Sequence, residues 1–244
     1  MSAQHPPQLI VALDYADAFE ALALAHQLHA LHPWMKVGLE LLMHAGTQIV
    51  ADLRDLGFPV FLDGKFHDIP NTVAGAVHGA VLSGANMLNV HAAGGVRMMR
   101  AAREAADVAA MTNALGRPLV IAVTVLTSLS PEELRDEVGY AHPLDTQVVM
   151  LAQRAREAGL DGVVASVREA AAIKTACGQD FKVITPGIRP ADGPTDDQRR
   201  IATPAAAITA GADFLVVGRP ITQAADPLAA CAQIMAEIEE AAAG

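Results

Sequence analysis

The sequence predicts an α/β protein, a single (β/α)8 TIM barrel over residues 1–244 with its active site at the C-terminal ends of the strands. Eight short apolar segments alternate with helix-like stretches, at intervals of about 30 residues. Most of these segments are continuously apolar, which is typical of parallel strands buried on both faces. The chain length fits one such barrel, and no linker or low-complexity segment divides it.

The expected strands are short and rich in Val, Ile, Leu and Ala. In chain order they are residues 8–14, 34–38, 60–65, 87–91, 119–126, 162–165, 182–185 and 214–218. The Ala- and Leu-rich stretches between them have helical periodicity. The clearest of these stretches are residues 18–31, 46–56, 96–115 and 145–158. Glycine recurs at the helix ends, where a C-cap favours the left-handed conformation that glycine adopts readily.

Two expected loops are longer than a barrel requires. One spans residues 128–144, after the fifth strand, and the other spans residues 186–198, after the seventh. Both lie at C-terminal strand ends, where barrels build their active sites from loops.

Composition and charge exclude other classes of protein. A net charge of −10 argues against general nucleic-acid binding, which requires a basic surface. Cys177 and Cys231 stand alone in helical contexts, which favours a reducing compartment over a disulfide. The N-terminus lacks the basic and apolar regions of a signal peptide, and no run of about 18 apolar residues predicts a membrane span. We therefore expect a cytoplasmic protein that binds neither nucleic acid nor membranes.

Charged residues interrupt the ends of the first three expected strands. Asp14 ends the first, Lys36 lies in the second, Asp63 and Lys65 end the third, and Asp68 follows. Side chains alternate along a strand, so Asp63 and Lys65 are expected to share one face. Alone, Asp14 could instead cap a helix, and Lys36 could extend its amine to solvent. Together, the alternating charges indicate a buried ion network or a catalytic site, and a phosphate site elsewhere in the chain favours catalysis.

That second site follows the last two expected strands. Gly218 and Arg219 follow the eighth strand, and Arg189 and Gln198 follow the seventh. Barrels commonly bind phosphate with these two loops. Glycine lets the backbone N–H approach closely, and arginine makes paired, always-charged contacts.

The stretch around the third strand resembles the D-x-K-x-x-D-I-x-x-T signature of the orotidine 5′-phosphate decarboxylase family. The matching residues are Asp63, Lys65, Asp68, Ile69 and Thr72. Other segments resemble that family's strands in the same order, so the resemblance spans nearly the whole chain. They are residues 9–14, 34–38, 123–128, 185–189 and 216–220. One departure is Gly64, where the family often has a larger residue such as Leu.

The resemblance implies decarboxylation of orotidine 5′-phosphate to UMP, the last step of de novo pyrimidine nucleotide synthesis, without a metal or an organic cofactor. It implies that Lys65 protonates the carbanion and that Asp63 lies against the substrate carboxylate. An ammonium at this position would stabilise the developing negative charge and then deliver the proton. Lys36 and Asp14 would hold the ribose hydroxyls and orient the charges.

The resemblance also implies which residues bind the phosphate and the pyrimidine of the substrate. Arg189, Gln198, Gly218 and Arg219 would bind the 5′-phosphate, and Thr127, expected at the end of the fifth strand, would contact the pyrimidine. Spacing alone does not separate Thr127 from its neighbour Ser128.

A homodimer with shared active sites is implied as well, in which Asp68, Ile69 and Thr72 complete the site of the partner. The residues alone indicate that Asp68, five positions past Asp63, is poorly placed to fold back into its own pocket.

Two other functions fit the same barrel. The magnesium-dependent sugar-phosphate decarboxylases and hexulose-phosphate synthases share the D-x-K-x-x-D pattern. They need an acidic metal ligand on the second strand, where this chain has Lys36, which would repel Mg²⁺. A barrel kept as a nucleotide-binding or structural module would be favoured if one of the array charges were missing, and none is.

Overall fold

The computed structural model describes residues 6–190 and 202–243. Eight parallel strands pair in chain order and close into a barrel, which confirms the predicted fold class. The strands are β1 (Gln8–Leu13), β2 (Trp34–Val37), β3 (Val60–Phe66), β4 (Met87–His91), β5 (Leu119–Val123), β6 (Gly162–Val164), β7 (Lys182–Thr185) and β8 (Phe214–Val217). Pairing of β1 with β8, in which Gln8 faces Phe214, closes the ring.

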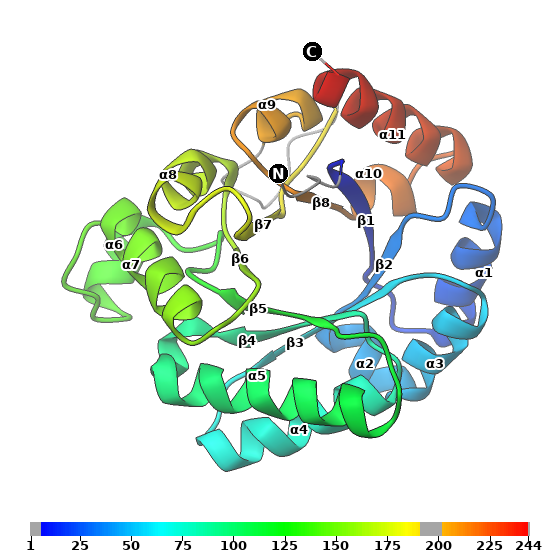
Figure 1. Ribbon diagram of the computed structural model, residues 1–244. Helices are drawn as coiled ribbons and strands as arrows, with labels where there is room; N and C mark the ends of the chain where they lie inside the picture. Colours follow the sequence, from blue (N-terminus) through cyan, green and yellow to red (C-terminus); the bar gives the residue numbers. More distant parts are fainter. Residues whose placement is uncertain (1–5, 191–201, 244) are drawn as a thin grey trace.

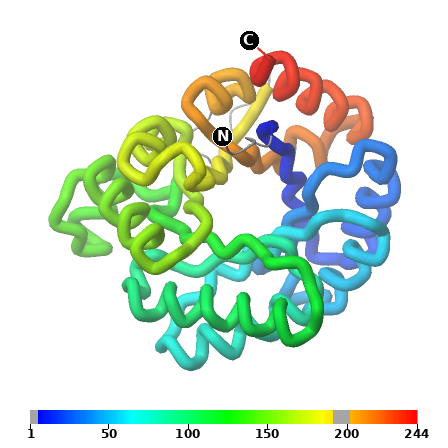
Figure 2. Tube along the Cα trace, in the orientation of Figure 1, coloured from blue at the N-terminus to red at the C-terminus, as the bar shows by residue number. Residues whose placement is uncertain are grey.

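Helices connect the strands and surround the barrel, as Figure 1 shows. They are α1 (Ala18–Leu28), α2 (Leu39–Ala45), α3 (Gln48–Asp55), α4 (Pro70–Leu82), the 3-10 helix η1 (Ala92–Gly94), α5 (Gly95–Thr112), α6 (Pro131–Asp136), α7 (Leu144–Glu157), α8 (Val167–Cys177), α9 (Pro204–Thr209), α10 (Arg219–Thr222) and α11 (Pro227–Ala243). The trace in Figure 2 shows α4 and α5 packed side by side on the outside of the barrel. None of the described helices is long and apolar enough to cross a membrane.

Alternation along the strands separates two apolar layers. Ile10 and Ala12 of β1 point into the barrel, where they pack with Phe61 of β3. Val11 and Leu13 point outward and pack with the surrounding helices. Because side chains alternate with a period of two, the next inward position on β1 is Asp14 and the next on β3 is Asp63. The middle of the barrel interior is therefore apolar, and the interior becomes charged at the C-terminal ends of the strands. The inward residues of the apolar part are Ile10, Ala12, Phe61, Met87, Ile121, Ile184, Phe214 and Val216.

The fifth strand is shorter than the sequence predicted. β5 ends at Val123, whereas the apolar run continues to residue 126. Val123 pairs with Val164, the last residue of β6, and with His91, the last residue of β4, so both neighbouring strands end at this level. The lengths of the neighbouring strands, rather than local hydrophobicity, set this boundary. The long loop that follows contains α6, which begins with a capping box between Ser130 and Glu133.

Candidate active site

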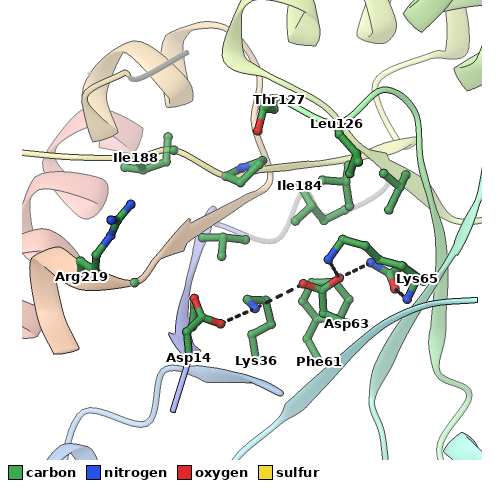
Figure 3. A pocket seen from close by; sticks show the side chains of 18 of the residues that line it. Asp14, Lys36, Phe61, Asp63, Lys65, Leu126, Thr127, Ile184, Ile188 and Arg219 are labelled. Carbon is green, nitrogen blue, oxygen red and sulfur yellow. Dashed lines mark hydrogen bonds and ion pairs between the residues drawn. The ribbon is translucent and has the colours of Figure 1, made fainter. Parts of the chain in front are cut away.

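The C-terminal mouth of the barrel holds a cavity of about 260 Å³. Its floor is formed by inward residues such as Phe61 and Ile184, and its walls carry the charged residues at the ends of β1, β2 and β3. The loops after β5, β7 and β8 contribute the opposite wall, including Thr127, Arg189 and Arg219. Figure 3 shows the charged side chains on one side of this space and Thr127 and Arg219 on the other. A charged wall facing an apolar and basic wall suits a polar ligand that carries an anionic group.

Four charged side chains form a continuous chain along this wall (Figure 3). The Lys36 Nζ lies 3.1 Å from Asp14 Oδ1 and 3.3 Å from Asp63 Oδ2. The Lys65 Nζ lies 2.7 Å from Asp63 Oδ1. Lys36 and Asp63 are buried, Lys65 is half-buried, and Asp14 is exposed. The structure thus brings together the four residues that the sequence placed at the ends of the first three strands.

The alternation of positive and negative charges keeps the two buried residues, Lys36 and Asp63, ionised. Burial alone would lower the pKa of Lys36, but the carboxylates of Asp63 and Asp14 outweigh it and raise that pKa. Burial alone would raise the pKa of Asp63, but Lys36, Lys65 and hydrogen bonds from Lys65 and Asn89 outweigh it and lower that pKa. Both residues therefore stay charged inside the mouth, where isolated charges would be neutralised.

The sequence predicted that regular strand alternation would bring Lys65 to the same face as Asp63. The two side chains do meet, but the backbone between them is irregular. The backbone φ of Lys65 is +48°, in the left-handed region, and the pairing of β3 with β4 shifts register between Leu62 and Phe66. The strand is bulged at the charged pair, so Lys65 is aimed by an irregular backbone. Bulges of this kind commonly re-aim a side chain beside an active site.

Sequence reasoning missed Asn89, which touches both members of this pair. Asn89 lies in β4, two residues after the inward Met87, and has no exposed surface. Its amide donates to Asp63 and accepts from the backbone N–H of Lys65. The available signal was a single amide side chain within the otherwise apolar run of residues 87–90.

The residues expected to bind phosphate lie across the cavity from the charged chain. Arg189 follows β7 and is buried, and Gly218 and Arg219 follow β8. All three line the cavity. A Cβ added to Gly218 would lie at an ordinary van der Waals distance, 3.6 Å, from both Ala12 and Asp14, which places this glycine beside the charged end of β1. Gln198 lies outside the described residues.

Thr127 lines the cavity although it does not end a strand. The expectation that it ends the fifth strand was wrong, because β5 stops four residues earlier, at Val123. The loop after β5 instead folds over the mouth and carries Thr127 into the wall. Ser128 is exposed and does not line the cavity, so the structure favours Thr127 of the two candidates.

Three residues of the signature lie away from the cavity of their own chain. Asp68, Ile69 and Thr72 are exposed, and none of them lines the cavity. Ile69 is 67% exposed. Asp68 accepts a hydrogen bond at 2.6 Å from the backbone N–H of Ile69, the residue that precedes α4.

The charged residues at the mouth are poorly arranged to bind a metal ion. The Lys36 ammonium already lies between the two carboxylates that could ligate a cation, Asp14 and Asp63. Within residues 6–190 and 202–243, no group of three or more His, Cys, Asp or Glu side chains is arranged to hold a metal ion.

Comparison with known proteins identifies the family. The family model described as "Orotidine 5′-phosphate decarboxylase / HUMPS family" matches residues 7–234. A protein named orotidine 5′-phosphate decarboxylase from Chromobacterium violaceum is 55% identical over 230 residues, which cover 94% of this chain and 91% of that protein. One of the same name from Halorhodospira halophila is 55% identical over 244 residues and covers 100% of both chains.

Solved structures agree. The crystal structure of orotidine 5′-phosphate decarboxylase from Lactobacillus acidophilus has a TM-score of 0.85 and 37% identity, and covers 95% of this chain and 99% of its own. An uncharacterized conserved protein from Geobacillus kaustophilus has a TM-score of 0.83 and 42% identity, and covers 94% and 99%. The chain therefore belongs to the orotidine 5′-phosphate decarboxylase / HUMPS family, and the prediction of a carboxy-lyase from its sequence signature is confirmed at the level of that family.

Proposed function

We propose that this chain decarboxylates orotidine 5′-phosphate to UMP, the last step of de novo pyrimidine nucleotide synthesis. The observation that carries the proposal is the chain of alternating charges along one wall of the cavity, with Arg189 and Arg219 on the other wall. This arrangement offers an anion site for a phosphate at one end and a carboxylate–ammonium pair for the reacting carbon at the other.

The reaction uses the Asp63–Lys65 pair. The substrate carboxylate enters beside Asp63, whose ionised state is maintained by its two lysines, and the like charges disfavour the bound substrate. The bond between C6 of the pyrimidine and the carboxylate carbon breaks, CO₂ leaves, and the electron pair remains on C6. The Lys65 ammonium stabilises that carbanion, donates a proton to C6, and regains a proton from water.

The remaining residues orient the substrate. Asp14 and Lys36 hold the ribose hydroxyls, since a carboxylate accepts and an ammonium donates. Thr127 contacts the edge of the pyrimidine. The 5′-phosphate is bound by Arg189 and Arg219 with the backbone of Gly218, together with Gln198.

The proposal includes no metal and no organic cofactor. Lys36 supplies fixed positive charge between Asp14 and Asp63, in the place where a magnesium-dependent enzyme would hold its ion. The charged chain thus contains both the electrostatic stabilisation and the proton that the reaction requires.

The working unit is proposed to be a cytoplasmic homodimer of single-domain subunits. Asp68, Ile69 and Thr72 face away from the cavity of their own chain, which supports their insertion into the partner's mouth. A two-fold axis would place both loops reciprocally.

The test is the loss of orotidylate absorbance on incubation with the purified protein, run with EDTA, with added Mg²⁺ and with neither. Equal rates in all three are expected. The Lys65→Ala variant serves as the control for contaminating host enzyme. Abolition of turnover by EDTA and its recovery with Mg²⁺ would instead favour a sugar-phosphate substrate, to be checked with a hexulose phosphate.

A further inference from the structure

Asn89 joins the two residues that the proposed reaction uses. Its Nδ2 donates to Asp63 Oδ1 at 2.7 Å, and its Oδ1 accepts from the Lys65 backbone N–H at 2.7 Å. The Lys65 Nζ contacts the same Asp63 oxygen at 2.7 Å. Asn89, Asp63 and Lys65 thus close a ring in which one amide touches the side-chain carboxylate of Asp63 and the backbone of Lys65.

The orientation of this amide is determined by chemistry. A backbone N–H can only donate, so the Asn89 atom facing Lys65 is the oxygen. An ionised carboxylate can only accept, so the atom facing Asp63 is the nitrogen. Both requirements are met by one orientation, and Asn89 has no exposed surface through which water could replace either bond.

The backbone of Lys65 needs such a partner. Its φ of +48° is uncommon for a residue with a side chain, and such conformations persist only where the surroundings hold them. The ladder between β3 and β4 is interrupted between Leu62 and Phe66. The Asn89 side chain therefore binds the Lys65 N–H within the segment where β3 and β4 fall out of register.

We propose that Asn89 is a positioning residue for decarboxylation, whose amide holds the Asp63 carboxylate and the left-handed Lys65 backbone in one geometry. The inference rests on the proposed function for its kinetic consequence, but its structural consequence does not. Because the ammonium of Lys65 is aimed by its backbone, loss of the amide would displace the proton donor while leaving the opposite, phosphate-binding wall untouched.

Two substitutions separate the two bonds. Asn89→Leu keeps the number and branching of the side-chain heavy atoms and removes both hydrogen bonds. Asn89→Asp keeps an acceptor for the Lys65 N–H but replaces the donor to Asp63 with a second carboxylate. Thr124→Val is the matched control, because Thr124 is also buried near the mouth and donates to the Val164 carbonyl at 2.8 Å, yet touches none of the charged chain.

Kinetics and ligand binding are measured together on the purified full-length proteins, with UMP titration counting the competent sites. In Asn89→Leu we expect kcat per competent site to fall about 10- to 100-fold, the size of effect that follows from a small misplacement of a reacting group, with UMP affinity unchanged. Thr124→Val should keep the wild-type kcat per site. A kcat loss in Asn89→Leu that merely follows the loss of competent sites would reduce Asn89 to a folding role and overturn the proposal.

The pH profile of Asn89→Asp gives a readout that a folding role would not move. Asp63 is faced by Lys36 and Lys65, and His91 at the end of the adjacent strand β4 interacts with it electrostatically. A carboxylate at position 89 would raise the proton affinity of the resulting pair of acids. The acidic limb of kcat should therefore move to higher pH than in the wild type. An unmoved limb would show that the amide does not act on Asp63, and the proposal would fail.

Crystal structures of Asn89→Leu and Asn89→Asp keep the inference independent of the substrate. Departure of Lys65 from the left-handed region, or separation of its Nζ from Asp63, supports the positioning role in either variant. A Lys65 unchanged in both would overturn it. A wild-type protein without activity on orotidine 5′-phosphate would refute the proposed function, while these structures would still decide the role of Asn89.

Discussion

The Lys65 Nζ lies 2.7 Å from Asp63 Oδ1 although Lys65 is held in a left-handed backbone conformation. The two residues are separated by Gly64 alone, and the irregular backbone of β3 turns Lys65 toward the cavity that Asp63 also lines. A charged pair held this closely would resist separation, since Asp63 is also bound by Lys36 from the other side. The geometry concentrates the chemistry of the mouth on one carboxylate and its two ammonium partners.

Lys65→Ala should remove nearly all turnover while leaving UMP binding intact. In the proposed reaction the ammonium acts on the carbanion, which exists only during turnover, and UMP would bring no carboxylate beside Asp63. Single-turnover kinetics and UMP titration of the same preparation test this expectation. Substantial residual decarboxylation would transfer the role of proton donor to another group, with Lys36 the nearest alternative.

Arg219→Ala should raise KM far more than it lowers stability. The side chain lines the cavity just after β8, and a charge-assisted contact to phosphate contributes about 1.5–3 kcal/mol, or about 10- to 150-fold in binding. Arg154→Ala is the matched control, because Arg154 is exposed on α7 and pairs with Glu157 far from the cavity lining. A KM equal to that of the control would exclude Arg219 from the phosphate site.

Mixing of inactive subunits should restore activity if the sites are shared. Lys65→Ala and Asp68→Ala homodimers should each be nearly inactive. In a mixed dimer, the Asp68→Ala chain supplies an intact Lys65, and the Lys65→Ala chain lends it Asp68, so one site of two is complete. The measurement is turnover after the two variants are unfolded and refolded together.

The control for this experiment is heterodimer formation, followed with differently tagged chains. If Asp68 worked within its own chain, every site in the mixture would retain one lesion. Confirmed heterodimers without recovered turnover would therefore rule out the shared site.

Stability should depend on pH through Asp63. Its pKa is lowered in the folded state, so its contribution to stability is present above the unfolded pKa of about 3.9 and is lost as the pH falls through the folded value. The free energy of unfolding of the wild type, measured in urea relative to Asp63→Asn, should shift in favour of the wild type as the pH rises from about 2 to 6. Each unit by which folding lowers the pKa of Asp63 contributes about 1.4 kcal/mol to the free energy of unfolding at neutral pH. A pH-independent difference would mean that Asp63 is not held by its lysines.

Substitutions at Gly64 and Phe66 should have coupled effects on the free energy of unfolding. A Cβ at Gly64 would lie 2.8 Å from the Phe66 ring, so the ring must move to admit any side chain. Gly64→Ala is expected to destabilise by about 1 kcal/mol, as overpacking of about 1–3 kcal/mol is partly offset by a less flexible unfolded chain. The cost should shrink in a Phe66→Leu background, and a double-mutant cycle in urea measures the coupling. If the destabilisations caused by the two substitutions were additive, the Phe66 ring would move without cost to admit the new side chain.

Local pattern in the sequence determined the barrel and the position of most of its charges. Continuous apolar runs separated by helical periodicity are properties of neighbouring residues, and they predicted eight parallel strands. The period of two along a strand is equally local, so the inward direction of Asp14 and Asp63 followed from the residues before them. The signature around β3 was sufficient to predict the family that the comparisons confirm.

Contacts between distant segments decided the rest. The left-handed Lys65 depends on Asn89, 24 residues further along the chain and on the adjacent strand, and no local pattern encodes that bond. β5 stops at Val123 because β6 ends at Val164, and this places Thr127 in the wall of the cavity rather than at a strand end. Strand ends and bulges are set by the hydrogen bonds that a neighbouring strand can offer, and those partners are chosen only when the barrel closes.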